Sequence, residues 1–267
     1  MVFLSASDES CGEGVFHHAG YVAPNICWTD VFNPAWEKLV LSGPPRLEEF
    51  HVTQLRSRSW REVHGISLDE AESRIDNAVD LISETEGMFS VRSSVDGPHF
   101  EKQADGLLFK LNDARRAPVE FVIDYPSFHG YVYLTMMVCS TYAKAERVDF
   151  MVEKKREVFP AIHDFHRGLR ESFTNIGLPR VGDLVGELTA GDKRSIPLQA
   201  ADLLCWHYQR LAASARNTAI NFSDVDAKRL SKLTRFGAGH TWERGMIEEM
   251  CSTFFDDWKK LNEENES

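Results

Sequence analysis

The chain has 267 residues, of which 43% are hydrophobic and 27% charged, so it is long and apolar enough to bury a full core. It has no run of about 18 apolar residues, which argues against a membrane span. Its formal net charge of −11 argues against a protein that coats nucleic acid electrostatically, but it is compatible with an enzyme whose acids hold divalent cations.

Cysteine usage and the amino-terminal segment indicate the compartment. The first residues lack the basic region and the long apolar run of a signal peptide. Five cysteines are scattered along the chain without a C-x-x-C pair, so neither a zinc knuckle nor a disulfide framework is predicted. We therefore expect a cytoplasmic protein.

The chain opens with a predicted hairpin. Residues 2–7 form a short apolar run suited to a buried strand, and that strand is expected to end directly on Asp8 and Glu9. The glycine-bearing turn at 11–14 leads into a partner strand at 15–23.

A helix, a strand and a second helix are predicted next. An Asn cap, an early Pro and a terminal Gly predict a short helix over 32–43, and 47–55 is expected to be a third strand. The clearest amphipathic helix covers 67–87, where Ser67 and Glu70 form a capping box and a glycine closes the pattern.

The middle of the chain alternates strands with apolar helical segments. Residues 88–95 predict a strand, and 96–128 mix glycine, proline and charge, as an irregular insertion or a flexible lid does. An almost wholly apolar segment at 131–145 predicts a core helix, and the strand 148–153 ends on Glu153.

The last predicted core helix carries an acid in an unexpected place. After a helix at 156–175 and a strand at 183–189, apolar residues recur at three- and four-residue steps through 195–211, with Ser195 as a cap. Asp202 lies within or at the border of that apolar face. An unpaired buried carboxylate costs several kcal/mol, so Asp202 should be protonated, paired or bound to a metal.

These elements predict an α/β fold whose strands end on acids. Strand ends of α/β sheets are where sites assemble, and carboxylates that meet there repel one another unless cations lie between them. Hard oxygen ligands suit Mg²⁺ or Mn²⁺, and two such ions about 4 Å apart can drive phosphodiester hydrolysis. The alternative is that each acid is only a cap or a solvated strand end.

Four blocks of the sequence are familiar: "DES" after the first strand, "EFH" at 49–51, "VDFMVEKK" at 148–155 and "SIPLQAADLLCWHY" at 195–208. Over about residues 2 to 212 they resemble the domain of unknown function 3800 family of the ribonuclease-H-like superfamily. The last block is the most specific, because the family pattern there is S-x(2–3)-Q-x-A-D-L.

The resemblance implies a fold and an extent. It implies a ribonuclease-H-like mixed sheet flanked by helices over residues 1–215, with the irregular insertion near 96–128. Residues 216–267 are expected to form a helical C-terminal extension packed on the same domain.

The resemblance also implies roles for individual residues. Asp8 is the first metal ligand and Asp202 the last, and Glu153 stands where the family usually has Asp. Gln199, one turn before Asp202, would orient that carboxylate or the attacking water. His51 would protonate a leaving group or help to bind phosphate.

The remaining site residues are expected from position. Glu9 is a possible fourth metal ligand, because it follows Asp8. Lys193, Arg194 and Ser195 precede the helix that carries Asp202, and a helix N-terminus favours an anion. We expect them to contact the substrate.

Several other patterns fit either a functional role or an ordinary structural one. "HDFH" (His163 and His166) could ligate a metal but more often marks a helix surface. "RSRSWR" at 56–61 and "KRLSKLTR" at 228–235 could follow a phosphate backbone, or could be solvated surfaces. Cys205 is expected to be a small core residue.

The sequence therefore predicts a metal-dependent hydrolase, a nuclease acting on nucleic-acid phosphodiesters with Mg²⁺ or Mn²⁺. Two alternatives stay open. One is a catalytically inert recognition or assembly module with a protein partner or a second copy of itself, and the other is a hydrolase of a small phosphorylated molecule. No membrane partner is expected.

Overall fold

The computed structural model of the chain describes residues 1–12, 14–96, 135, 138–139, 141, 145–154, 159, 162–163, 166, 179–216 and 221–242. The expected insertion at 96–128 lies outside the described residues except for its first residue. Most of the helices expected at 131–145 and 156–175 also lie outside them.

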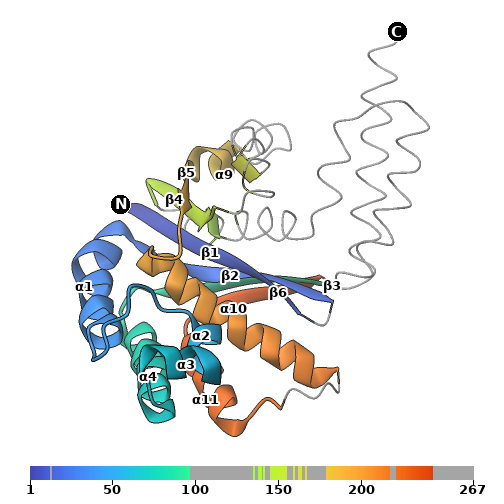
Figure 1. Ribbon diagram of the computed structural model, residues 1–267. Helices are drawn as coiled ribbons and strands as arrows, with labels where there is room; N and C mark the ends of the chain where they lie inside the picture. Colours follow the sequence, from blue (N-terminus) through green and yellow to red (C-terminus); the bar gives the residue numbers. More distant parts are fainter. Residues whose placement is uncertain are drawn as a thin grey trace.

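The fold is α/β, with a mixed six-stranded sheet in the order β5-β4-β1-β2-β3-β6 (Figure 1). The strands are β1 (Val2–Gly12), β2 (Val15–Pro24), β3 (Phe89–Asp96), β4 (Arg147–Glu153), β5 (Val185–Gly191) and β6 (Gly237–Trp242). Strand β2 is antiparallel to β1 and β3, whereas β4 pairs parallel with β1 and β5, and β6 pairs parallel with β3. The expected mixed sheet flanked by helices is confirmed.

The predicted hairpin is present, but its first strand is longer than expected. Strand β1 continues past Asp8 and Glu9 to Gly12 because β2 pairs with it along that whole length, with Asp8 opposite Ala19. The prediction that the strand ends on the two acids is therefore wrong. They lie inside β1, near the point where its other neighbour, β4, ends.

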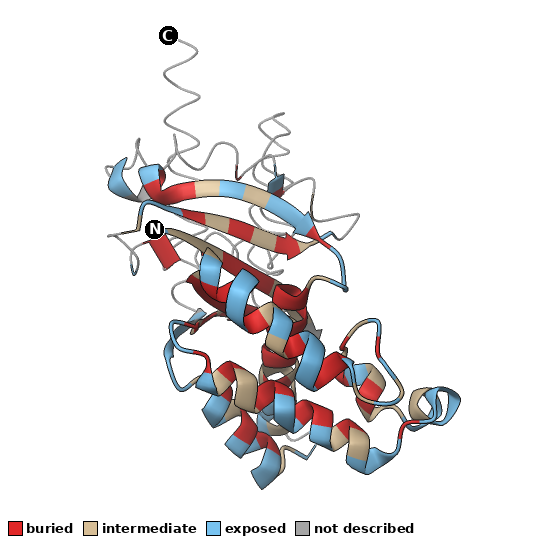
Figure 2. Cartoon of the chain, turned by 90° about the vertical axis from the view of Figure 1, so that its left-hand side faces the viewer, coloured by how far each residue is buried: buried red, intermediate tan, exposed pale blue. Residues whose placement is uncertain are grey.

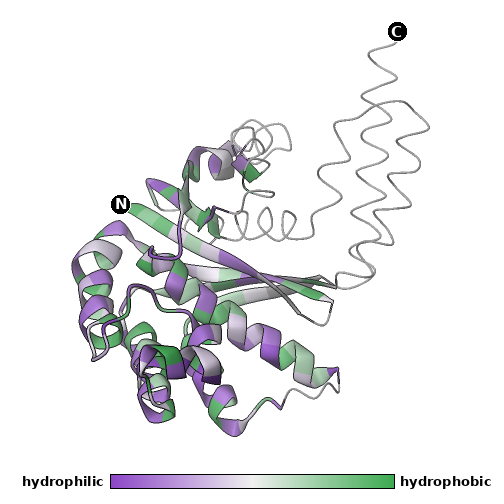
Figure 3. Cartoon of the chain, in the orientation of Figure 1, coloured by the Kyte–Doolittle hydropathy of each residue, from purple (hydrophilic) through white to green (hydrophobic). Residues whose placement is uncertain are grey.

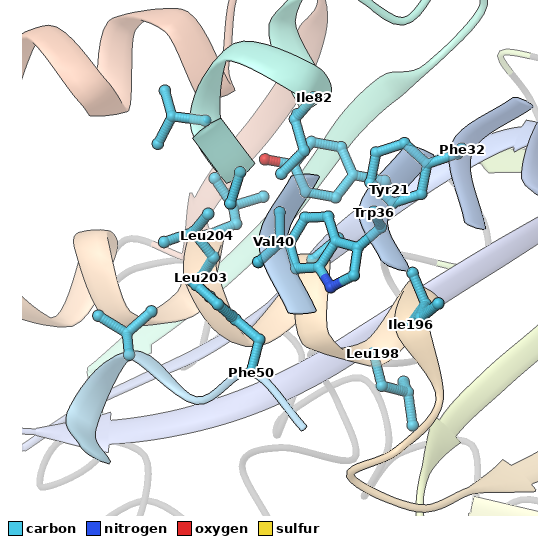
Figure 4. Packing of buried hydrophobic residues seen from close by; sticks show 14 of the residues in the cluster. Tyr21, Phe32, Trp36, Val40, Phe50, Ile82, Ile196, Leu198, Leu203 and Leu204 are labelled. Atoms are coloured by element: carbon cyan, nitrogen blue, oxygen red, sulfur yellow. The ribbon is translucent and has the colours of Figure 1, made fainter. Parts of the chain in front are cut away.

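Helices cover one face of the sheet around a single apolar cluster. Helix α10 (Ile196–Ala215) lies against β1 and β2, with α1 (Asn33–Trp36), α2 (Val52–Arg56), α3 (Arg58–His64), α4 (Leu68–Glu84) and α11 (Asp224–Leu233) on the same side (Figure 1). Tyr21, Trp36, Phe50, Leu198 and Leu203 interdigitate in this cluster (Figure 4). Burial of such large side chains is the main stabilising term in a core.

A second apolar cluster lies on the other face of the sheet. It joins Val91, Val148, Phe150 and Val152 to buried residues that include Val138. Helix α9 (Pro179–Leu184) precedes β5 on this side (Figure 1). Figure 2 shows the buried residues on the strands and on the inward helix faces, and Figure 3 shows hydrophobic and hydrophilic residues alternating around α4 and α10.

The helix expected over 32–43 starts earlier than predicted. It is continuous with a π-helical segment, η1 (Cys27–Phe32), and ends in a second one, η2 (Glu37–Leu41). Asn33 has helical dihedral angles and is not the N-cap that was expected. Buried apolar residues recur at four-residue steps through the whole helical segment, at Trp28, Phe32, Trp36 and Val40. Their burial outweighs the helix-start signal of Asn33 and Pro34.

Two further differences concern element type. Residues 47–55 do not form a strand: the segment up to His51 is irregular and α2 begins at Val52. Within the expected helical extension 216–267, Gly237–Trp242 forms β6 and adds a strand to the sheet beside β3. Among the described residues, no helix has the length and apolarity to cross a bilayer.

Helix α4 begins as the sequence predicts. The Ser67 side chain accepts from the backbone N–H of Glu70 at 3.1 Å, and the Glu70 carboxylate accepts from the Ser67 N–H at 2.8 Å. This capping box satisfies two N–H groups that the helix itself cannot.

Replacing Ser67 with Ala should destabilise the protein by about 1 kcal/mol, because α4 loses its capping acceptor. Equilibrium urea unfolding measures the change. Ser231→Ala is the matched control, because it makes the same chemical change at an exposed interior position of α11, where Ala is the better helix former. It should leave stability equal or slightly higher, and equal losses in both variants would contradict the capping role.

Candidate active site

A pocket of about 210 Å³ lies where the carboxyl ends of β4 and β5 meet the first turns of α10. It contains all the site residues expected from the sequence except Arg194 and Ser195. The lining residues are Asp8, Glu9, Phe50, His51, Glu153, Asp192, Lys193, Leu198, Gln199 and Asp202. Five of these are carboxylates and one is a lysine, so the pocket is strongly acidic.

Two of the acids are neighbours because β1 and β4 are parallel. The register pairs Ser7 with Val152, so Asp8 and Glu153 are the next residues along the two strands. Side chains alternate along a strand, and Met151, two residues before Glu153, packs in the cluster beneath α10. Asp8 and Glu153 therefore project from the face of the sheet that α10 covers.

Contacts to the backbone fix α10 against β1 beside Asp8. The buried thiol of Cys205 donates to the carbonyl oxygen of Asp8 at 3.2 Å, and Ser10 Oγ donates to the Cys205 carbonyl at 3.3 Å. Cys205 is thus the small core residue expected. The Asp8 carboxylate also accepts from the backbone N–H of Glu9 at 2.7 Å. One turn of α10 before Cys205, Asp202 reaches the same pocket.

Asp202 is paired with His51. The two atoms His51 Nδ1 and Asp202 Oδ2 lie 2.8 Å apart, and both side chains are about three-quarters buried. An ionised carboxylate only accepts, so the imidazole donates through Nδ1 and its Nε2 is left for other contacts. The backbone N–H of Val52 lies 3.5 Å from the same carboxylate oxygen. Asp202 was expected to be protonated, paired or bound to a metal, and in the structure it is paired.

This pair shifts the protonation of the histidine. The hydrogen bond to Asp202 raises the pKa of His51 above its ordinary value, against the opposing effect of partial burial. His51 therefore carries positive charge at higher pH than a free histidine, next to a pocket of acids.

Gln199 supports the wall of the pocket from inside the core. Its Oε1 accepts from Trp36 Nε1 at 2.9 Å and from the Phe50 backbone N–H at 3.2 Å, and its Nε2 donates to the Lys193 carbonyl at 3.0 Å. It was expected to orient the Asp202 carboxylate or a water. Among the described residues its hydrogen bonds instead hold the segments that carry His51 and Lys193.

The loop before α10 divides its residues between two surfaces. Lys193 lines the pocket, whereas Arg194 is exposed and pairs with Glu48 at 3.2 Å. Ser195 is the N-cap of α10, but its side chain makes no capping hydrogen bond and does not line the pocket. Arg194 and Ser195 are thus outside the group of residues that the structure brings together.

The sequence interpretation missed Asp192 as a pocket residue. Asp192 follows β5 directly, and Gly191 pairs with Glu153 across the parallel strands. The rule that acids at strand ends gather at one sheet edge applies to it as well. It was overlooked because the predicted strand ended at 189, two residues too early.

The basic clusters are largely engaged in ion pairs within the protein. Arg56 pairs with Glu72 at 2.8 Å and reaches the buried Asp226, and Arg229 pairs with Glu72 and Asp76. Lys232 pairs with an acid on α4. "KRLSKLTR" is thus mainly a helix surface that packs on α4, and Arg56 is engaged by acids of the protein itself.

The two histidines of "HDFH" lie away from the acidic pocket. His163 and His166 line a different cavity beside β5, where His166 Nε2 lies 2.9 Å from the Gly186 carbonyl oxygen. A ring nitrogen next to a carbonyl is a hydrogen-bond donor and is then not a metal ligand.

The chemistry of the pocket fits a hard divalent cation. Five of its described lining residues offer carboxylate oxygens, and none of those described residues carries a thiol. Asp202 Oδ1 accepts no hydrogen bond from the described residues, so it is open to a cation while Oδ2 holds His51. As the side chains stand, no group of three His, Cys, Asp or Glu in the described part of the chain is close enough to hold one ion.

Comparison with protein-family models, curated proteins and solved structures gives no match.

Replacing Asp202 with Asn should lower the pKa of His51 in metal-free protein, because the partner loses its charge. Proton NMR titration in EDTA measures it. Asp80→Asn is the control: Asp80 pairs with Lys232 on another face and should leave the His51 titration unchanged. An unaltered His51 pKa in Asp202→Asn would contradict the pairing.

The same pair should make stability depend on pH. Because the folded pKa of His51 is raised, its contribution is complete below the unfolded value of 6.5 and is lost as pH rises through the folded value. The loss of unfolding free energy in His51→Gln should therefore be larger at about pH 6 than at about pH 9. Urea unfolding in EDTA tests this, and a loss that grows with pH would be the opposite result.

Proposed function

We propose that the protein is a divalent-metal-dependent hydrolase that cleaves phosphodiesters, with nucleic acid as the substrate. Asp8, Glu153 and Asp202 would hold Mg²⁺ or Mn²⁺, with Glu9 as a further ligand. The observation that carries the proposal is that acids from β1, β4 and α10 line one pocket together with His51 and Lys193.

Electrostatics favours a cation in this pocket. Five carboxylates line one pocket of about 210 Å³, together with Lys193 and His51, and like charges gathered in one pocket repel one another. Mg²⁺ and Mn²⁺ prefer carboxylate oxygens, and either ion would relieve the repulsion. When bound, such an ion activates water and stabilises charge on a phosphodiester's leaving oxygen.

The protein's own side chains supply the other functions that hydrolysis needs. Asp202 fixes the imidazole of His51 through Nδ1 and favours its protonated form, so His51 can give a proton to a leaving oxygen. Lys193 offers positive charge to a phosphate at the pocket mouth. Gln199 holds both residues in place through the backbone.

The fold is compatible with this proposal. In the order β5-β4-β1-β2-β3, β2 runs antiparallel to its neighbours, and the acids lie at the centre of the sheet and on the helix that covers it. This supports the ribonuclease-H-like fold that the sequence resemblance implies. Fold alone does not establish activity, so the proposal depends on the pocket.

Mg²⁺ or Mn²⁺ should raise the melting temperature, and EDTA should reverse the rise, because an ion that binds only the folded protein stabilises it by mass action. Glu153→Gln should reduce the shift. Glu187→Gln is the matched control, because Glu187 is exposed on the neighbouring strand β5 and lines a different cavity. A melting temperature that no cation moves would assign the acids to structure and favour an inert recognition module.

Purified protein with Mn²⁺ should cleave labelled DNA or RNA, and Asp8→Asn and Glu153→Gln should each abolish cleavage while Glu187→Gln retains it. The assay uses single- and double-stranded DNA and RNA beside bis(p-nitrophenyl) phosphate. Cleavage of the small phosphodiester alone would favour the hydrolase of a small phosphorylated molecule. No turnover of any of them, with cation binding intact, would refute the catalytic proposal.

A further inference from the structure

A second space, a shallow and open groove, adjoins the acidic pocket and shares part of its wall. It has a volume of about 560 Å³ and follows α2 and α3, and His51 and Lys193 line both spaces. A chain whose phosphate lies in the acidic pocket can therefore continue into the groove without leaving the protein surface.

The wall of the groove contains two stacked rings. The imidazole of His64 lies over the indole of Trp60 with ring centroids 4.0 Å apart and an angle of 18° between the planes. His64 Nδ1 donates to the Trp60 carbonyl oxygen at 2.8 Å, since a carbonyl can only accept, and this hydrogen bond fixes the ring. His64 is exposed and Trp60 packs against the core, so the pair is a supported aromatic surface.

The polar residues of the groove suit a sugar–phosphate chain. Ser57 and Ser59 place hydroxyl groups near the rings, and Lys193 places a cation at the junction with the acidic pocket. Arg58 on the same short helix forms an exposed ion pair with Glu62 at 2.7 Å, so Lys193 is the cation that lines the groove. Cationic and hydroxyl groups beside an aromatic surface are what bind unpaired nucleotides without sequence preference.

We infer that this groove binds an unpaired base next to the phosphate in the acidic pocket, which makes the substrate single-stranded nucleic acid. The inference rests on the proposed function. A flat ring surface can stack only on the face of a base that is not already covered by its neighbours. In a duplex those faces are stacked, and exposing one requires unpairing and unstacking.

The test measures binding of a fluorescein-labelled single strand of about 12 nucleotides and of the matched duplex, by anisotropy in Ca²⁺. His64→Ala should weaken single-strand binding about fivefold or more and leave duplex binding unchanged. Trp60→Leu should do the same, but Trp60 packs on the core, so the exposed His64 is the primary variant. Phe236→Ala is the control, because Phe236 is an exposed ring outside the groove.

Strands that carry one abasic site, moved along the sequence, locate the stacked base. At one position, the abasic site should reduce the affinity of the wild type as much as the substitution His64→Ala reduces affinity for the intact strand. At that position, the abasic site should cause no further loss of affinity in the His64→Ala variant. The inference would be overturned if the losses of affinity from the abasic site and from His64→Ala added at every position. It would also be overturned if His64→Ala weakened binding of the duplex and of the single strand equally.

The outcomes separate this inference from the proposed function. Unchanged single-strand binding in His64→Ala and Trp60→Leu, with Mn²⁺-dependent cleavage intact, overturns the groove and keeps the hydrolase. If the wild type binds neither single strand nor duplex, the inference about the groove is overturned. Hydrolysis of bis(p-nitrophenyl) phosphate then decides whether the hydrolase proposal survives.

Discussion

The buried amide of Gln199 is the interaction on which the geometry of the acidic pocket depends. It joins Trp36 on α1 and the backbone of Phe50 to the carbonyl of Lys193, which lies much later in the sequence. A buried amide that loses such partners leaves polar groups unsatisfied, so this arrangement is strongly specified. His51 follows Phe50 directly, and Lys193 begins the turn into α10, so both walls of the pocket are set by one side chain.

The sequence predicts the strands of the sheet well because their apolar patterns are local. The hairpin, β3 and β4 are found within a few residues of the expected positions. The helix α4 is found for a similar reason, since its capping box and apolar stripe lie within one segment. The error at 47–55 has a physical cause. Phe50, Val52 and Leu55 are buried, but they lie in an irregular segment followed by a helix and not in a strand.

Features that depend on distant pairing were not predictable. Strand β6 is short and glycine-rich, and only its parallel pairing with β3 makes it a strand. The acids at positions 8, 153 and 202 could be singled out one by one, by strand ends and by the resemblance. The partner of Asp202 could not be predicted, because His51 is 151 residues away in the sequence and no local pattern links the two. For the same reason, the scaffold contacts of Gln199 were not expected.

The ion pairs of Arg56 have a consequence for the groove on α2 and α3. Arg56 ends α2, immediately before α3, and links it to Glu72 on α4 and to the buried Asp226 on α11. The helices that carry the stacked rings are thereby tied to the main core, although their outer surface is exposed. A surface that is already rigid loses little conformational entropy when a flexible strand binds to it. Most of the entropy lost on binding is therefore that of the strand.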